Sequence, residues 1–168
     1  PVTVATLLIA YGALMRFDAL LVHSRLAIEN ERAAAIHQGI GPLLPSYGRF
    51  QVSTAPDDPY RADVRSYLDR ASSMTLGGFY EASFREPFYI VLVQLFLALA
   101  GGHELGILLQ SLFFSVAVLP LVFYLVSRMS GRWWAAAALI PLIFHEWLIL
   151  EAPTGYRMSA YAFFIVAF

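Results

Sequence analysis

The sequence contains no cysteine and no lysine, and charged residues of either sign are scarce. Without cysteine the chain can form neither a disulfide framework nor a thiolate metal site. Every basic residue other than the four histidines is arginine. Arginine suits phosphate recognition, but the codon bias of a GC-rich genome explains its use equally well. The net charge of -1 excludes a generally basic nucleic-acid binder. We therefore expect no nucleic-acid partner.

The few charges are separated from the apolar sequence. Charged residues make up 14% of the chain and hydrophobic residues 59%, whereas an average soluble domain carries about 25% charged residues. Nine of the 12 acidic residues and eight of the 11 arginines lie between Arg16 and Glu86. A chain that contacts both water and lipid requires such a separation. The pattern predicts an all-α, polytopic membrane helical bundle with a long extracytoplasmic loop that contains amphipathic helices.

Both ends of the chain are predicted to be cut spans, since about 20 apolar residues are needed to cross a bilayer. Residues 1–16 are apolar from position 2 to 15 and stop at Arg16. They lack the basic start and the small-residue cleavage site of a signal peptide. Residues 158–168 begin a further apolar segment that the chain does not complete. We interpret the chain as the N-terminal part of one larger membrane domain.

Three apolar segments lie between these ends. Residues 104–127 and 133–150 are expected to span, and Trp133 and Trp134 open the second at the membrane interface. Residues 87–102 contain only 14 consecutive apolar positions, a length more typical of a re-entrant or interfacial helix than of a span.

The polar segment 17–86 is predicted to be the outer loop. Its first part, from about residue 18 to 38, has the mixed apolar and charged character of an amphipathic surface helix. Glycine and proline are frequent from 39 to 60, which indicates a loop. A second helix is expected from Asp58 and Pro59 to about Met74, because aspartate is a favourable N-cap and proline a favourable first helical residue.

Charge asymmetry orients the predicted spans. Short arginine-rich loops stay in the cytoplasm, which places Arg128 and Arg132 inside. If the long loop 17–86 is outside, an odd number of spans must lie between this loop and the two arginines. The 104–127 span is one, so the 87–102 helix should not cross the membrane. The short turn 151–157 then lies outside and faces the long loop.

Several short motifs follow one another in a recognisable order. Asp63 is followed at helical spacing by Tyr67, and a Gly-Gly-Phe-Tyr turn occupies 77–80. An Arg-Glu-Pro-Phe-Tyr motif at 85–89 opens the next apolar helix, and a long span ends in Ser-Arg-Met-Ser-Gly-Arg at 127–132. Over residues 57–168 this arrangement resembles the GT-C superfamily of membrane glycosyltransferases. It is most similar to the protein mannosyltransferase and lipid A aminoarabinose transferase branch.

The resemblance implies a reaction and a set of site residues. The donor is a sugar linked to a polyprenyl phosphate in the membrane lipid, and the acceptor is unknown. The acidic residue of the first outer loop, here Asp63, is the general base that takes the acceptor proton. Arg85 and Glu86 match the polar pair before the proline-led helix, and Arg85 could bind the donor phosphate. Tyr67, Asp58 and the intramembrane Glu146 are the other residues that we expect to bind substrate.

Structural roles account for the same residues without catalysis. A first-turn carboxylate such as Asp63 stabilises a helix through its dipole by ~0.3–1 kcal/mol. Asp58 can act as a cap alone, and Arg85 can anchor a helix end at the lipid headgroups. Interfacial tyrosines such as Tyr67 are also common.

A metal cofactor has little support in the sequence. Many members of the family carry an acidic pair in the second outer loop, at the start of the following span. Residues 153–159 contain no acid, and Glu151 lies several residues too early. His145 has no partner at metal-ligand spacing. We therefore assign no metal ligands, and a divalent ion is not an expected requirement.

Glu146, next to His145, supports a competing interpretation. A carboxylate within a span marks a functional site or a buried partner by default, although near the end of the span it can reach the outer surface. With prolines at 120 and 141, this pair would also suit a transporter or channel subunit. A non-catalytic membrane scaffold is the third alternative. We expect a multi-pass protein of the bacterial inner membrane, with the 17–86 loop outside.

Overall fold

The structure, a computed structural model, is helical throughout its regular elements. It describes residues 1–23, 31–43, 59–73, 86–102, 105–155 and 157–168. All regular elements in these segments are helices. The all-α prediction is therefore confirmed for the described part of the chain.

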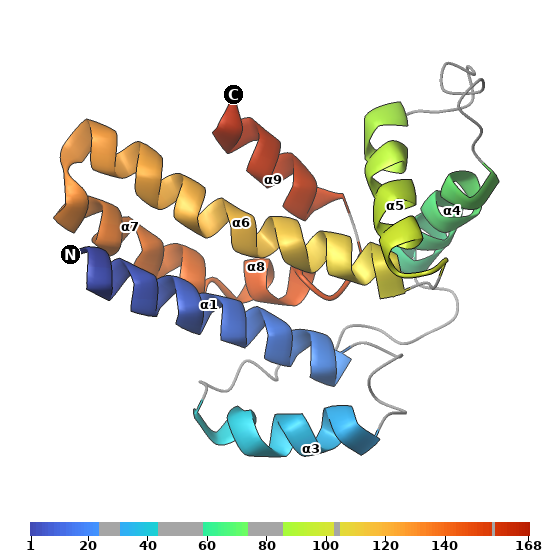
Figure 1. Cartoon of the computed structure of the whole chain (residues 1–168), viewed down its shortest axis with the longest axis horizontal. Coiled ribbons are helices and arrows are strands. Elements are labelled where there is room, and N and C mark those ends of the chain that lie inside the picture. Colours follow the sequence, from blue (N-terminus) through green and yellow to red (C-terminus); the bar gives the residue numbers. More distant parts are fainter. Residues whose placement is uncertain (24–30, 44–58, 74–85, 103–104, 156) are drawn as a thin grey trace.

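Three helices run side by side and form the long axis of the molecule (Figure 1). They are α1 (Val2–His23), α6 (Leu105–Ser130) and α7 (Arg132–Phe144). Their facing sides bury a shared apolar core that includes Met15, Leu119 and Leu139. The central helix, α6, also packs against the C-terminal helix on its other side, so it connects the two halves of the fold.

The first helix extends beyond the predicted boundary at Arg16 and reaches His23. The Arg16 side chain does not end the helix by reaching out to water, because it is completely buried. Its Nε donates to Ser115 Oγ at 2.8 Å, and its two terminal nitrogens donate to the carbonyls of Gly12 and Leu142 at 3.0 Å each. Asp18, which follows it, is buried as well.

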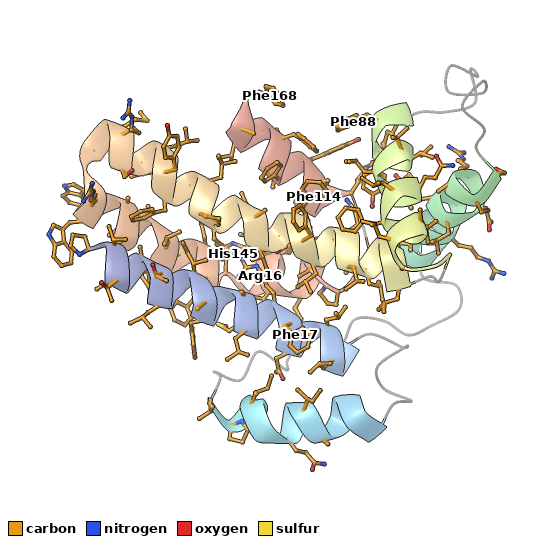
Figure 2. All side chains as sticks on the ribbon, in the orientation of Figure 1. Arg16, Phe17, Phe88, Phe114, His145 and Phe168 are labelled. Carbon is orange, nitrogen blue, oxygen red and sulfur yellow. The ribbon has the colours of Figure 1, made fainter. Side chains whose placement is uncertain are left out.

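The predicted span 133–150 contains two helices rather than one, because the helix is interrupted at His145. Helix α7 ends at Phe144, and a short helix α8 (Glu146–Glu151) follows. His145 between them has an extended backbone with ψ 106°. The Leu142 carbonyl at the end of α7 accepts a hydrogen bond from Arg16. Figure 2 labels Arg16 and His145 in this part of the bundle. The cation thus satisfies a carbonyl that a continuous helix would have bonded to its own backbone.

Helix α6 contains 26 residues and tolerates Pro120 in its interior. It includes Arg128, which we had placed in a loop, and ends at Ser130. Only Gly131, with φ 90°, separates it from α7. This left-handed conformation favours glycine. The predicted basic loop is therefore a tight turn between two helices.

A second core forms where α6 begins. Helices α4 (Pro59–Ser73) and α5 (Pro87–Leu99) pack against each other, and α5 and α9 (Met158–Ala167) pack on α6. Phenylalanines interlock there, with Phe114 of α6 within 5.3 to 6.3 Å of rings on α5 and α9. The predicted bounds of α4, the short apolar helix after Pro87 and the start near Met158 agree with these elements. Helix α5 stands across the direction of α6 (Figure 1).

A short helical segment lies below the first helix in Figure 1. It consists of α3 (Glu31–Ile40) and the 3₁₀ turn η1 (Gly41–Leu43). The Tyr11 hydroxyl of α1 donates to the Leu43 carbonyl at 3.3 Å. The amphipathic helix predicted from 18 to 38 is thus divided, since residues 18–23 belong to α1 and 31–40 to α3.

Two of the described helices are long and apolar enough to cross a membrane, namely Val2–Leu21 within α1 and all of α6. Core helices of soluble proteins and signal sequences can pass the same test. Only 39% and 44% of the most apolar window of each helix is buried. A soluble core helix would be mostly buried, so the two helices weakly indicate membrane insertion.

We predict that Gly106→Ala destabilises the contact between α5 and α6. A Cβ at this position would lie 2.7 Å from the Phe96 carbonyl oxygen and 2.8 Å from the Leu97 backbone. Because backbone atoms cannot swing aside, the helices must separate, at a cost of about 1–3 kcal/mol. Thermal unfolding followed by circular dichroism measures the loss.

Gly39→Ala is the matched control for this prediction. A Cβ there meets nothing within 4 Å, and the residue lies in helix α3. The substitution should raise stability by about 0.5–1 kcal/mol, because alanine has less backbone freedom to lose on folding. Equal effects at the two positions would contradict the close approach of α5 and α6.

Candidate functional site

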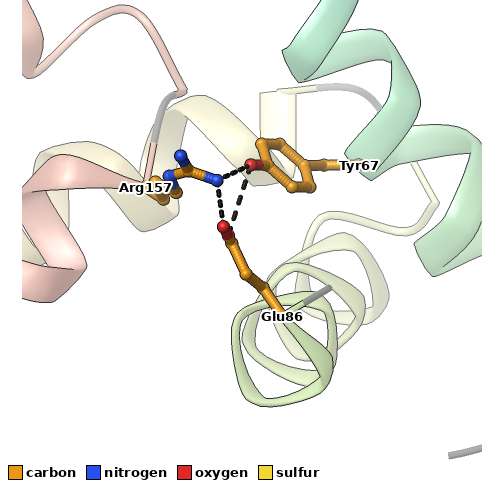
Figure 3. A network of polar contacts seen from close by, with 3 residues as sticks. All are labelled: Tyr67, Glu86 and Arg157. Atoms are coloured by element: carbon orange, nitrogen blue, oxygen red, sulfur yellow. Dashed lines mark hydrogen bonds and ion pairs between the residues drawn. The ribbon is translucent and has the colours of Figure 1, made fainter. Parts of the chain in front are cut away.

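Three polar side chains from distant parts of the sequence meet where α5 and α9 begin, beside the middle of α4 (Figure 3). One terminal nitrogen of Arg157, Nη1, forms an ion pair with Glu86 Oε1 and donates to the Tyr67 hydroxyl at 2.7 Å. The Tyr67 hydroxyl in turn lies 3.2 Å from Glu86 Oε2, to which it donates. The three groups form a closed ring of contacts, which we call the Tyr67–Glu86–Arg157 cluster.

Local sequence places each member of this cluster. Glu86 is the N-cap residue of α5, and the proline after it starts that helix. Its carboxylate makes no cap hydrogen bond to the helix and is directed to Arg157 instead. Arg157 is in turn the residue before α9, and its guanidinium carbon lies 5.9 Å from the centroid of the Tyr161 ring. Tyr67 lies midway along α4.

The cluster is partly open to solvent. The side chains of Arg157 and Glu86 are 28% and 17% exposed. Burial, together with the negative charge of Glu86, raises the pKa of Tyr67 to about 12, although the Arg157 charge opposes this. Tyr67 therefore remains a neutral hydroxyl that can accept from the arginine and donate to the carboxylate throughout the physiological range.

A second, fully buried layer of polar groups lies behind the cluster. The Tyr89 ring packs edge-on against Tyr67 with centroids 4.9 Å apart. Its hydroxyl lies 2.9 Å from the Gly155 carbonyl and 3.2 Å from Gln110 Oε1, both within hydrogen-bonding distance. Gly155 approaches the side chain of Ile107 at the start of α6. The turn after α8 is thereby fixed against both α5 and α6.

Glu151 is the acidic member of this inner layer. Only 6% of the residue is exposed, and Ser111 Oγ donates to its backbone carbonyl at 3.3 Å. Among the described residues, neither Glu151 Oε1 nor the buried Gln110 Nε2 has a hydrogen-bond partner. Burial raises the pKa of the Glu151 carboxyl to about 7. A buried acid with such a pKa can exchange a proton near neutral pH.

The structure brings together two of the six residues selected from the sequence. Tyr67 and Glu86 are in direct contact. Position 63 lies on α4 one helical turn before Tyr67, and its side chain is outside the described part of the structure, as are Asp58 and Arg85. Glu146 is the first residue of α8 and is partly buried. No described contact joins it to the Tyr67–Glu86–Arg157 cluster.

The other site residues were not identified from the sequence. Arg157 and Glu151 flank the turn in which we looked only for a metal-binding acidic pair. Tyr89 is the last residue of the Arg-Glu-Pro-Phe-Tyr motif at 85–89, which also contains Glu86. Gln110 and the neighbouring Ser111 interrupt an otherwise apolar run, which is a signal of an inward-facing polar side.

The site does not contain an evident metal centre. Within the described residues no three histidine, aspartate or glutamate side chains gather in a way that could hold a metal ion.

Comparison of the chain with protein-family models, with curated proteins and with solved structures finds no match in any of the three.

We predict that Glu151 makes the stability of the protein depend on pH. Its folded pKa of about 7 lies above the ordinary value of 4.5, so the folded state holds more protons than the unfolded state between these values. Stability therefore falls as the pH rises from 4.5 to 7 and stays low above, by about 3 kcal/mol in total. Denaturant unfolding across this pH range measures it.

The variant Glu151→Gln should lose this pH dependence and be more stable than the wild type at pH 8. Glu146→Gln, which changes a partly buried glutamate on the same short helix, should keep it. A pH profile that is unchanged in Glu151→Gln would contradict the assignment.

Proposed function

We propose that this protein is part of an integral membrane glycosyltransferase. It transfers a sugar from a polyprenyl-phosphate donor to an acceptor at the extracytoplasmic face. Tyr67, Glu86 and Arg157 carry the proposal, because their contacts join the segments that the resemblance to the GT-C superfamily assigns to the reaction. The helix with position 63, the Arg-Glu-Pro-Phe-Tyr motif and the turn 151–157 all contribute to this cluster.

The chemistry of the reaction matches what these groups supply. The acceptor must lose a proton while the anomeric carbon is attacked, so a carboxylate must face the acceptor. We assign this role to Asp63, one turn before Tyr67 on α4. A donor phosphate needs cationic hydrogen-bond donors, and a guanidinium binds phosphate strongly. We assign this role to Arg157 of the cluster and to Arg85, which precedes Glu86 in the sequence.

The arrangement of the ends of α6 supports the proposed topology. Gly155 lies against Ile107 near the first turn of α6, whereas Arg128 lies in its last turn. A helix of 26 residues is about 39 Å long, which exceeds the ~30 Å hydrocarbon thickness. The turn 151–157 and the arginine-rich turn would therefore lie on opposite sides of a bilayer. We therefore propose a multi-pass protein of the bacterial inner membrane, with this site on the extracytoplasmic side.

A transporter is the second candidate. The interruption of α7 and α8 at His145, beside the buried Arg16, favours it, because transporters bind their substrates at interrupted helices with exposed backbone groups. The Leu142 carbonyl is already occupied by Arg16, however. In addition, the site around Tyr67 lies near the start of α6 rather than beside the middle of that helix. These two observations make the transferase the better supported proposal.

Sugar transfer should depend on Asp63. In the full-length protein reconstituted into bilayers, Asp63→Asn should lower transfer from a polyprenyl-phosphate sugar by about 10²–10⁴-fold, the usual contribution of a general base. Transfer of a radiolabelled sugar is the measurement. Asp69→Asn, an exposed aspartate on the same helix, should stay within about twofold of wild type.

Full transfer activity in Asp63→Asn would remove the catalytic assignment. Solute flux into proteoliposomes that disappears in Glu146→Gln, with no sugar transfer in any variant, would establish the transporter instead. Absence of a phenotype in both variants would favour the scaffold.

The membrane orientation can be tested by chemical labelling because the chain contains no cysteine. Ser72→Cys on α4 and Ser130→Cys at the end of α6 each introduce one exposed thiol. A membrane-impermeant maleimide applied to intact spheroplasts should modify the first and not the second. Both should react after lysis. Labelling of position 130 alone in intact spheroplasts would place the proposed site in the cytoplasm and refute the topology.

A further inference from the structure

The turn between α6 and α7 concentrates exposed arginine and tryptophan side chains at one end of the helical bundle. Arg128 and Arg132 are both exposed. Met129, Trp133 and Trp134 are 84%, 67% and 71% exposed. We call residues 128–134 the basic–aromatic turn. Large apolar groups are normally covered, so two adjacent exposed tryptophans indicate a surface that contacts another phase or molecule.

Nothing in the described part of the chain neutralises the two arginines. Residues 105–145 contain no aspartate or glutamate. No hydrogen bond or ion pair of either guanidinium occurs among the described residues. The carboxylates of Glu86 and Glu151 lie near the opposite end of α6. Among the described residues, the two arginines at this end of α6 therefore have no carboxylate beside them.

The combination of side chains fits a lipid headgroup region. Tryptophan prefers the boundary between hydrocarbon and water, where the ring is in an apolar layer and the indole N–H finds an acceptor. Guanidinium groups bind phosphate oxygens with two parallel hydrogen bonds. A patch for a soluble anion would not need the exposed indoles, and a purely apolar patch would not need the arginines.

We propose that the basic–aromatic turn binds the headgroups of anionic phospholipids in the cytoplasmic leaflet. The arginines contact the phosphates, and the two tryptophans lie at the level of the headgroups just below them. The inference rests on the membrane insertion in the proposed function, and it adds a lipid partner of stated charge that is separate from the sugar-transfer site. Cytoplasmic leaflets rich in anionic lipid attract such residues.

Fluorescence quenching of the two tryptophans tests this interaction. The chain has three tryptophans, so Trp147→Phe leaves only Trp133 and Trp134 as reporters. The protein is reconstituted into mixed bilayers of phosphatidylcholine and phosphatidylglycerol, in which one lipid at a time carries brominated acyl chains. The relative binding constant of the two lipids follows from how strongly each quenches at equal composition.

We expect a severalfold preference for phosphatidylglycerol, which 0.5 M salt weakens because exposed charges are screened. Each arginine removed should reduce the preference by about fivefold at most, so Arg128→Gln with Arg132→Gln should abolish it. Arg65→Gln with Arg70→Gln on α4 is the matched control and should leave it unchanged. Circular dichroism establishes that each variant is folded.

Three results would overturn the proposal. Equal quenching by both lipids would show that the turn does not select charge. A preference that persists in Arg128→Gln with Arg132→Gln would assign it to other residues. Absence of quenching by either lipid would mean that protein, such as a second copy of the chain, covers the tryptophans. Sugar transfer measured in the same bilayers separates this proposal from the proposed function. If no sugar is transferred but the preference for phosphatidylglycerol is intact, only the transferase is refuted.

Discussion

The buried guanidinium of Arg16 is the interaction on which the arrangement of the helices depends. Its donors bond to α1 itself, to Ser115 of α6 and to the Leu142 carbonyl at the end of α7. A cation removed from water must have hydrogen-bond partners, because an unpaired buried charge is very unfavourable. Three helices therefore have to meet at this one side chain. Gly12 permits the approach, since a Cβ there would lie only 2.9 Å from Ile143.

The interruption beside Arg16 also positions the candidate site. Because α7 stops at Phe144 and the chain changes direction at His145, α8 lies against α6, where Ser115 Oγ lies 3.4 Å from the Leu148 carbonyl. The turn that follows then reaches the Tyr89 hydroxyl through Gly155. Arg157 is thereby brought to Glu86.

The sequence predicted the features that depend on local composition. The helical class, the proline-led start of α5 and the limits of α4 follow from apolar runs and capping residues that act within a few positions. It failed where a distant partner decides the outcome. Arg16 was interpreted as the end of a span because a charge usually stops one, and its acceptors lie on two other helices. Likewise Arg157 has a partner 71 residues away, which no pattern near the turn could reveal.

The contacts of Arg16 have a consequence for biosynthesis. Two of its acceptors lie 99 and 126 residues further along the chain. At about 5–20 residues per second, the ribosome needs on the order of ten seconds to supply them. During this interval α1 alone in a bilayer would carry an unsatisfied cation, at a cost of ~2.5 kcal/mol or more near the centre. If α1 enters a bilayer, as the proposed function requires, it has to remain with the insertion machinery, or at the water boundary, until the later helices are made.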